Sequence, residues 1–181
     1  LGNGGVHALD RHLVALIDLA TRQGVPRVAI HGATDGRDTA PDSARGFVAE
    51  LGQAAQGRAV IATLTGRYFA MDRDKRWPRT QLAYDAMMFG TGTPITDPVA
   101  GIEGAYARGE TDEFIKPLVV VDAAGQPVAP IGAGDGVLCV NFRADRMRQM
   151  VRVWANPEFD GFDRRGAPLM DVVTMTQYDQ T

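Results

Sequence analysis

Two kinds of apolar pattern alternate along the chain. In the first, apolar residues recur every three or four positions, which predicts helices over residues 9–22, 41–51, 78–88, 97–107 and 143–154. In the second, short apolar runs are bounded by turn residues, which predicts strands over residues 27–31, 59–65, 118–121, 137–140 and 171–175, the first two of them buried. Residues 90–96 are predicted to be a loop, and the turn-rich residues 125–136 a hairpin or small lobe.

This alternation predicts an α/β fold with a mostly parallel sheet, flanked by helices on both faces in three layers. The run VLCV at residues 137–140 is uninterrupted and is therefore expected to be a central strand. A length of 181 residues, without internal repeats or an evident linker, fits a single domain over residues 1–181. The pattern does not determine the order of the strands.

Composition excludes several classes of protein. The formal net charge is −3, so the basic surface typical of a nucleic-acid-binding protein is absent. Cys139 is the only cysteine, which excludes a disulfide framework and a cysteine-based zinc site. No apolar run approaches the roughly 20 residues that a membrane helix needs. We therefore expect a cytoplasmic, monomeric protein that binds neither nucleic acid nor membranes.

Arginine is strongly preferred over lysine, since 17 of the 19 cationic side chains are arginines. Codon bias would explain this excess, but arginine also binds carboxylates and phosphates with its planar fork. Position distinguishes the two explanations, because ligands of open parallel sheets bind beyond the carboxyl ends of the strands. Five arginines and one aspartate follow predicted strands, namely Arg37, Asp38, Arg67, Arg73, Arg143 and Arg146. Their shared location favours an anion-binding site at that edge of the sheet.

Two further features accompany these arginines. The glycines of GGVH, residues 4–7, would let the backbone approach a ligand closely, although a lone histidine such as His7 is more often structural. Several other aspartates lie beside arginines without metal-ligand spacing, which favours charge pairing over a metal site; they are Asp35, Asp72, Asp74 and Asp145. Asp38 differs from them, because a carboxylate among anion-binding arginines can hold a substrate hydroxyl or accept its proton.

Five motifs in the same order and register resemble the cofactor-independent, or 2,3-bisphosphoglycerate-independent, phosphoglycerate mutases: GGVH, DGRDT, GRYFAMDRDKRW, YARGETDEF and NFRADR. The resemblance covers essentially the whole chain. It implies an isomerase that interconverts 3-phosphoglycerate and 2-phosphoglycerate in glycolysis and gluconeogenesis. In that family an alkaline-phosphatase-like domain carries two Mn²⁺ or Mg²⁺ ions and a serine that is transiently phosphorylated. This chain resembles the second domain, which is inserted into the first and binds the glycerate part of the substrate.

The resemblance implies that the chain works with the phosphatase-like half of the same protein. The family's metal-binding motifs and its serine have no counterpart in this sequence. We therefore expect no cofactor within the chain, and we expect the isolated chain to be inactive. The alternative function is a free-standing module that binds a small phosphorylated acid without catalysis. An arginine-rich nucleic-acid domain is disfavoured by the acidic charge balance.

The resemblance also assigns the site residue by residue. The substrate-binding positions are His7, Arg37, Asp38, Arg67, Arg73, Arg143 and Arg146, and Asp38 is the candidate for proton transfer. The sequence departs from the family beside this site: Gly2-Asn3 stands where Ser-Asp is usual, Ala8-Leu9 where Ser-His is common, and Ala40 where proline follows DGRDT. These departures affect the surroundings of His7 and leave the charged groups intact.

Overall fold

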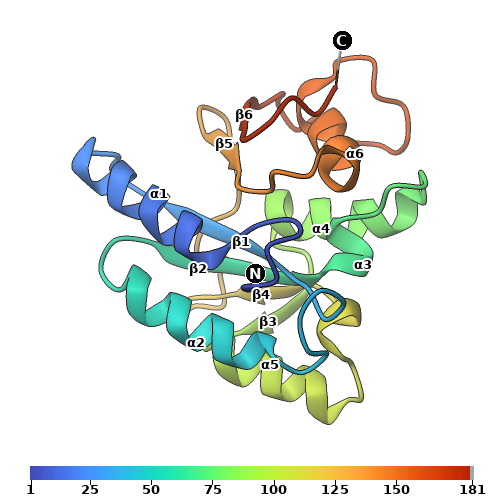
Figure 1. Cartoon of the computed structure of the whole chain (residues 1–181). Helices are drawn as coiled ribbons and strands as arrows, with labels where there is room; N and C mark the ends of the chain where they lie inside the picture. Colours follow the sequence, from blue (N-terminus) through green and yellow to red (C-terminus); the bar gives the residue numbers. More distant parts are fainter. Residues whose placement is uncertain (180–181) are drawn as a thin grey trace.

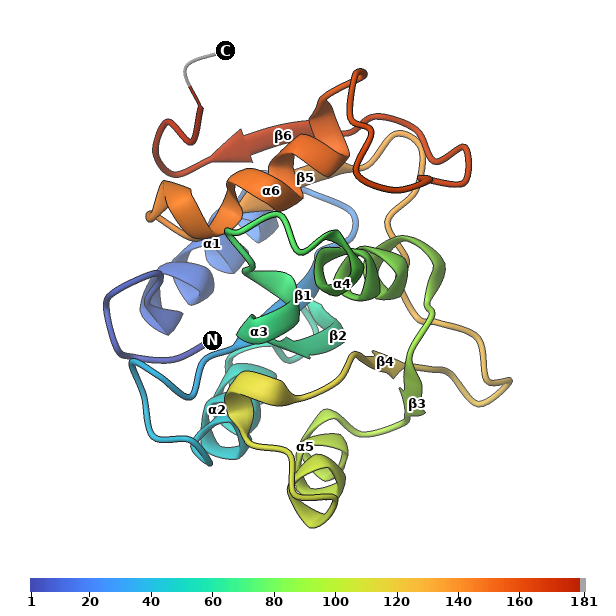
Figure 2. The same ribbon diagram turned by 90° about the vertical axis from the view of Figure 1, so that its right-hand side faces the viewer.

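The computed structural model describes residues 1–179, which build two sheets with helices around them (Figures 1 and 2). The helices are α1 (Asp10–Arg22), α2 (Ala44–Ala55), α3 (Arg67–Ala70), α4 (Trp77–Phe89), α5 (Pro98–Ala107) and α6 (Ala144–Ala155), with a 3-10 turn η1 (Asp112–Phe114). The strands are β1 (Ala29–Thr34), β2 (Val60–Gly66), β3 (Thr93–Ile95), β4 (Leu118–Val120), β5 (Gly136–Cys139) and β6 (Asp171–Thr174).

The larger sheet has the strand order β1-β2-β4-β3. The pairs β1–β2 and β3–β4 are parallel, and β2 runs antiparallel to β4. Helices α2 and α5 cover one face of this sheet, and α3 and α4 lie on the other side (Figure 1). Helix α1 packs against α2 and contributes to the same core. The predicted α/β class with a mostly parallel sheet between helical layers is therefore confirmed.

The two faces of the sheet correspond to two separate hydrophobic cores. Side chains from α1, α2 and α5 pack on one face against β1, β2 and β4, around Ile17, Val48, Leu64 and Ile102. The second core joins α3 and α4 to α6 and the C-terminal segment, around Tyr84, Met150, Val153 and Trp154. Because α6 belongs to the second core, its packing decides where the arginines at its N-terminus lie.

The prediction that residues 137–140 form a central strand is wrong. Strand β5 pairs only with β6, in a separate two-stranded parallel sheet (Figure 2). Cys139 faces the second core, but Leu138 and its register partner Val173 are 44% and 63% exposed. An apolar run of four residues is compatible with a buried strand and with a half-exposed one, so the pattern could not distinguish them.

Smaller differences concern the ends of elements. Strand β1 continues to Thr34, three residues beyond the predicted end of this strand at residue 31. Strand β3 lies within the predicted loop 90–96, where Pro94 is tolerated because β3 is an edge strand of the sheet. An isolated antiparallel bridge between Val121 and Pro127 closes a tight turn, which overlaps only the beginning of the hairpin or small lobe predicted over residues 125–136.

Asp112 in η1 caps α2 from a distance in the sequence and thereby fixes the loop after β1. Its buried carboxylate accepts hydrogen bonds from the backbone N–H groups of Ser43 and Ala44, at 3.0 and 2.8 Å. Its backbone carbonyl accepts a hydrogen bond of 2.6 Å from the hydroxyl of Thr34. Burial raises the pKa of Asp112 above its ordinary value, so this cap is held at an energetic cost.

Candidate anion-binding site

Strands β1 and β2 end at the same edge of the larger sheet. They are parallel, and their last residues Thr34 and Gly66 are register partners. The DGRD turn therefore follows β1 directly beside Arg67, which follows β2. The predicted meeting of these two segments at one edge is confirmed.

The turn after β1 is built around one carboxylate. Asp35 Oδ1 accepts hydrogen bonds from the backbone N–H groups of Arg37 and Asp38, at 3.0 and 3.1 Å. Gly36 has a φ of +71°, and a Cβ atom there would lie 2.8 Å from the Cβ of Asp112. Only glycine fits this position, because both the backbone angle and the space exclude a side chain.

Arg67 is the centre of a buried charge network and is only 4% exposed. Its Nη1 atom donates to Asp35 Oδ1 at 2.7 Å and to Asp38 Oδ2 at 2.6 Å. Burial opposes the charge of Arg67, but the hydrogen bonds to the two aspartates outweigh it and raise the pKa of the guanidinium. Burial also opposes ionisation of Asp35, yet its hydrogen bonds from Asp38 N–H and Arg67 hold its pKa below the ordinary value.

His7 joins this network from the N-terminal loop. Its Nε2 lies 2.9 Å from Arg67 Nη2 and 3.3 Å from Asp38 Oδ2. Burial, and next the charge of Arg67, lower the pKa of His7, so the ring is neutral at pH 7. A guanidinium can only donate, so Nε2 accepts from Arg67 and the ring proton sits on Nδ1. The N-terminal loop can approach the backbone of Asp38 this closely because Gly4 has no side chain. A Cβ atom at Gly4 would lie 2.6 Å from the carbonyl oxygen of Asp38.

A second group of arginines comes from the loop after α3 and from the N-terminus of α6. Asp145 bridges them: Arg143 Nε donates to its Oδ1 at 2.8 Å, and Arg73 Nη1 donates to its Oδ2 at 2.8 Å. The two arginines are 45% and 44% exposed, so their guanidinium groups are accessible to a ligand. The predicted charge pairing of Asp145 is confirmed.

Arg146 lies where the two groups meet. Its Nη1 donates to the carbonyl of Met71 at 3.2 Å, while its buried Nε has no hydrogen-bond partner within residues 1–179. Burial, and then the charges of Arg67, Arg73 and Arg143, lower the pKa of Arg146. The charge of Asp145 offsets only part of this repulsion, and Arg146 makes no ion pair within residues 1–179, so the positive charge of Arg146 has no carboxylate partner of its own.

The structure thus brings together six of the seven predicted site residues: His7, Asp38, Arg67, Arg73, Arg143 and Arg146. Arg37 is placed differently. It is 60% exposed and pairs with Glu113 Oε1 at 3.4 Å, on the outer side of the turn. The backbone N–H of Phe142 donates to the carbonyl of His7 at 2.8 Å and links the two groups directly.

Sequence reasoning missed Gln149, which ties α6 to the loop that carries Arg73. Its buried side-chain amide donates to Asp72 Oδ2 at 3.0 Å and accepts from the backbone N–H of Lys75. Gln149 lies three residues after Arg146 and therefore on the same face of α6. A polar residue beside the apolar Met150 on that face was the signal that could have revealed it.

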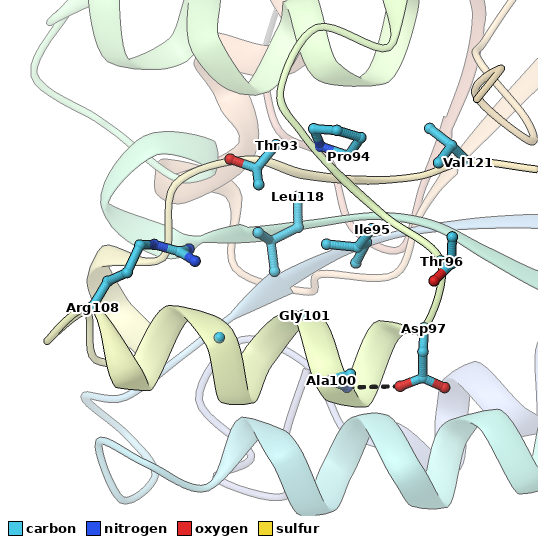
Figure 3. Close-up of a pocket in the computed structure, with 11 residues that line it drawn as sticks. Thr93, Pro94, Ile95, Thr96, Asp97, Ala100, Gly101, Arg108, Leu118 and Val121 are labelled. Atoms are coloured by element: carbon cyan, nitrogen blue, oxygen red, sulfur yellow. Dashed lines mark hydrogen bonds between the residues drawn. The ribbon is translucent and has the colours of Figure 1, made fainter.

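A cavity of about 500 Å³ lies elsewhere, between α5 and strands β3 and β4 (Figure 3). Its lining is mainly apolar, and the charged groups at its ends are already engaged. Arg108 pairs with Glu110, and Asp97 caps α5 by accepting from the backbone N–H of Ala100 at 2.7 Å. The cavity holds no combination of groups that would perform chemistry, so we place the functional site at the arginines.

Within residues 1–179, no group of three or more histidine, cysteine, aspartate or glutamate side chains could hold a metal ion. The donor set of the site, with arginine beside each aspartate, does not fit a divalent cation. No helix in the described part of the chain is long and apolar enough to cross a membrane.

Fold and site together define an α/β domain that gathers arginines to bind a small anion. The comparisons with known proteins give the family. The model for the N-terminus of BPG-independent PGAM matches residues 1–180. The chain therefore belongs to the family of 2,3-bisphosphoglycerate-independent phosphoglycerate mutases, and it matches the N-terminal region of that family.

Individual relatives agree with this assignment. The 2,3-bisphosphoglycerate-independent phosphoglycerate mutase of Thermomicrobium roseum is 50% identical and aligns with 99% of the chain, and that of Myxococcus xanthus is 48% identical over 98%. A phosphoglycerate mutase of Leishmania mexicana, solved at low cobalt concentration, has a TM-score of 0.93 at 33% identity and covers 99% of the chain. The chain spans only 35% of the length of each of these proteins.

Proposed function

We propose that this chain is the glycerate-binding domain of a phosphoglycerate mutase, an isomerase that interconverts 3-phosphoglycerate and 2-phosphoglycerate in the cytoplasm. The observation that carries the proposal is the position of Arg146, which lies close to Arg67, Arg73 and Arg143 and makes no ion pair within residues 1–179. A partly buried arginine whose neighbours are also arginines, and whose Nε lacks a partner within residues 1–179, supports binding of a multiply charged anion. Membership of the mutase family then favours phosphoglycerate as that anion.

The two groups of residues would have different tasks. Arg73, Arg143 and Arg146 would hold the carboxylate and phosphate, since Arg73 and Arg143 are partly exposed, share Asp145 and lie close to Arg146. Arg67 already contacts Asp35, Asp38 and His7 and would orient Asp38 and His7 instead of binding the ligand alone. Asp38 would exchange a proton with a glycerate hydroxyl, because its Oδ1 accepts no hydrogen bond within residues 1–179 and its side chain is 26% exposed.

The phosphoryl chemistry itself would depend on the other half of the protein. A serine of the phosphatase-like domain would carry the phosphate between the two hydroxyls, and metal ions bound by that domain would neutralise its charge. This chain's arginines would retain glycerate between the two transfers. A glycerate that escaped would turn the mutase reaction into hydrolysis, so tight positioning by several arginines matters more here than proton transfer alone.

Binding of 3-phosphoglycerate by this chain tests the proposal. We expect a calorimetric titration to show one site, with an affinity that falls as ionic strength rises. Arg146→Gln should weaken binding about 10- to 100-fold, because it removes a charge-assisted contact. Arg22→Gln removes the same charge from the exposed end of α1 and should leave the affinity unchanged. Equal binding by the Arg146 variant would contradict the proposed site.

The purified chain should show no mutase turnover. The reason is that the family's phosphorylated serine and metal-binding motifs have no counterpart in its sequence. The check is an assay for 2-phosphoglycerate after addition of 3-phosphoglycerate and Mn²⁺. Binding without turnover would also be the property of a free-standing binding module. Restored turnover on addition of a separately produced phosphatase-like half would distinguish the mutase domain from that alternative.

A further inference from the structure

The protein holds the carboxylates beside its arginines in different ways. Asp35 and Asp72 each accept two hydrogen bonds from backbone N–H groups, which fix them within their loops. Within residues 1–179, Asp145 accepts hydrogen bonds from the side chains of Arg73 and Arg143 and from no backbone N–H. The Asp145 carboxylate is therefore anchored only by arginines of the site.

The geometry around Asp145 is that of a bound carboxylate ligand. Arg143 grips both oxygens, with Nε 2.8 Å from Oδ1 and Nη2 3.3 Å from Oδ2, and Arg73 Nη1 lies 2.8 Å from Oδ2. Guanidinium groups frequently bind a carboxylate through both of its oxygens in this way, and a phosphate offers a similar pair of acceptors. The side chain of Asp145 is 32% exposed, so a ligand can reach it.

We propose that Asp145 is an internal placeholder: its carboxylate occupies Arg73 and Arg143 when no ligand is bound, and an anionic group of the ligand displaces it. The inference rests on the proposed function and adds a residue that sets the affinity of the site. A placeholder keeps two mobile arginine side chains ordered before binding. It also competes with the ligand and, once displaced, repels its negative charge.

The displacement is energetically feasible because these ion pairs are partly exposed. Exposed ion pairs stabilise a structure only slightly, since water screens the charges and long side chains lose conformational freedom when they pair. By contrast, the side chain of Arg67, which pairs with Asp38, is only 4% exposed. A ligand could not displace the Asp38 carboxylate from Arg67 as readily. Removing the competing charge at residue 145 should therefore increase affinity about three- to tenfold.

The test is a calorimetric titration of 3-phosphoglycerate and of D-glycerate, at one fixed ionic strength, into the wild-type chain and its variants. Asp145→Asn preserves the size of the side chain and removes the charge. Asp145→Ala also removes the remaining acceptor and should gain at least as much affinity. The matched control is Asp18→Asn, which removes the same charge from α1, where Asp18 pairs with Arg58.

Tighter binding by both Asp145 variants, with Asp18→Asn unchanged, would support the placeholder. A gain with D-glycerate would assign the displacing group as the ligand carboxylate, and a gain only with 3-phosphoglycerate would assign it as the phosphate. Equal or weaker binding by the variants, while the wild type binds, would overturn this inference and leave the proposed function standing. Failure of every protein, the wild type included, to bind either ligand would contradict both. Misfolding cannot imitate the expected result, because it lowers affinity.

Discussion

In a full-length mutase that carries this domain, Asp38→Asn should lower kcat about 10²- to 10⁴-fold while changing KM less than about threefold. Asparagine preserves the size of the side chain and can still accept a hydrogen bond from Arg67, so the network that orients residue 38 remains. The amide cannot accept a proton from a glycerate hydroxyl. Steady-state kinetics in the direction of 2-phosphoglycerate formation provides the measurement.

Two comparisons make this result specific. Asp42→Asn removes the same charge four residues later, at an exposed position, and should leave kcat and KM unchanged. Arg143→Ala should raise KM and also increase release of free glycerate relative to mutase turnover, because a ligand contact is lost. A kcat of Asp38→Asn within a factor of about three of the wild-type value would exclude Asp38 as the proton-transfer group.

Replacement of Arg67 should lower the stability of the fold strongly, because Arg67 is a buried cation between two aspartates. Arg67→Met leaves the carboxylates of Asp35 and Asp38 close together without the cation that they share, and we expect the free energy of unfolding to fall by about 3 kcal/mol. Urea unfolding of the chain, followed by circular dichroism near pH 7, would measure this difference. Arg67→Lys serves as the control, since a single ammonium restores the charge without the fork and should give an intermediate value.

The pH dependence of this variant has a definite sign. In the wild type the folded-state pKa of Asp35 lies below its unfolded value, so this group stabilises the fold above about pH 4 and ceases to do so as pH falls through the folded pKa. Protonation also removes the unpaired charge in Arg67→Met. The stability difference between the two proteins should therefore narrow below about pH 4. A difference that stays constant down to acid pH would contradict the charge network as its cause.

The rule that ligands bind beyond the carboxyl ends of parallel strands explains the position of one half of the site, and tertiary packing explains the position of the other half. Arg67 and the DGRD turn meet because β1 and β2 are neighbouring parallel strands. The alternating pattern predicts the parallel sheet, but not that these two strands are neighbours in it. Arg143 and Arg146 follow a strand of the separate sheet, so the same rule gave the correct region for a different reason. Their position depends on α6, which Gln149 and the second core hold against the loop of Arg73.

The ion-pair partner of each charged residue could not be predicted from the sequence pattern either. Charge pairing of the aspartates is predictable from the arginines beside them, but Asp35 pairs with Arg67, 32 residues away, and Arg73 shares Asp145, 72 residues away. Such pairs depend on which loops the fold brings together. The sequence could not show that Arg67 would be buried between two aspartates while Arg37 is mostly exposed.

The sequence by itself determined the main helices, the buried strands, the α/β class and the set of arginines on which the proposed function rests, since each depends on local periodicity or on residue type at a strand end. Only the tertiary structure decided the antiparallel pairing of β2 with β4, the separate sheet of β5 and β6, and the bridge that Asp145 makes between two arginines. These features arise from contacts between distant segments, whose free energy no short window of sequence contains.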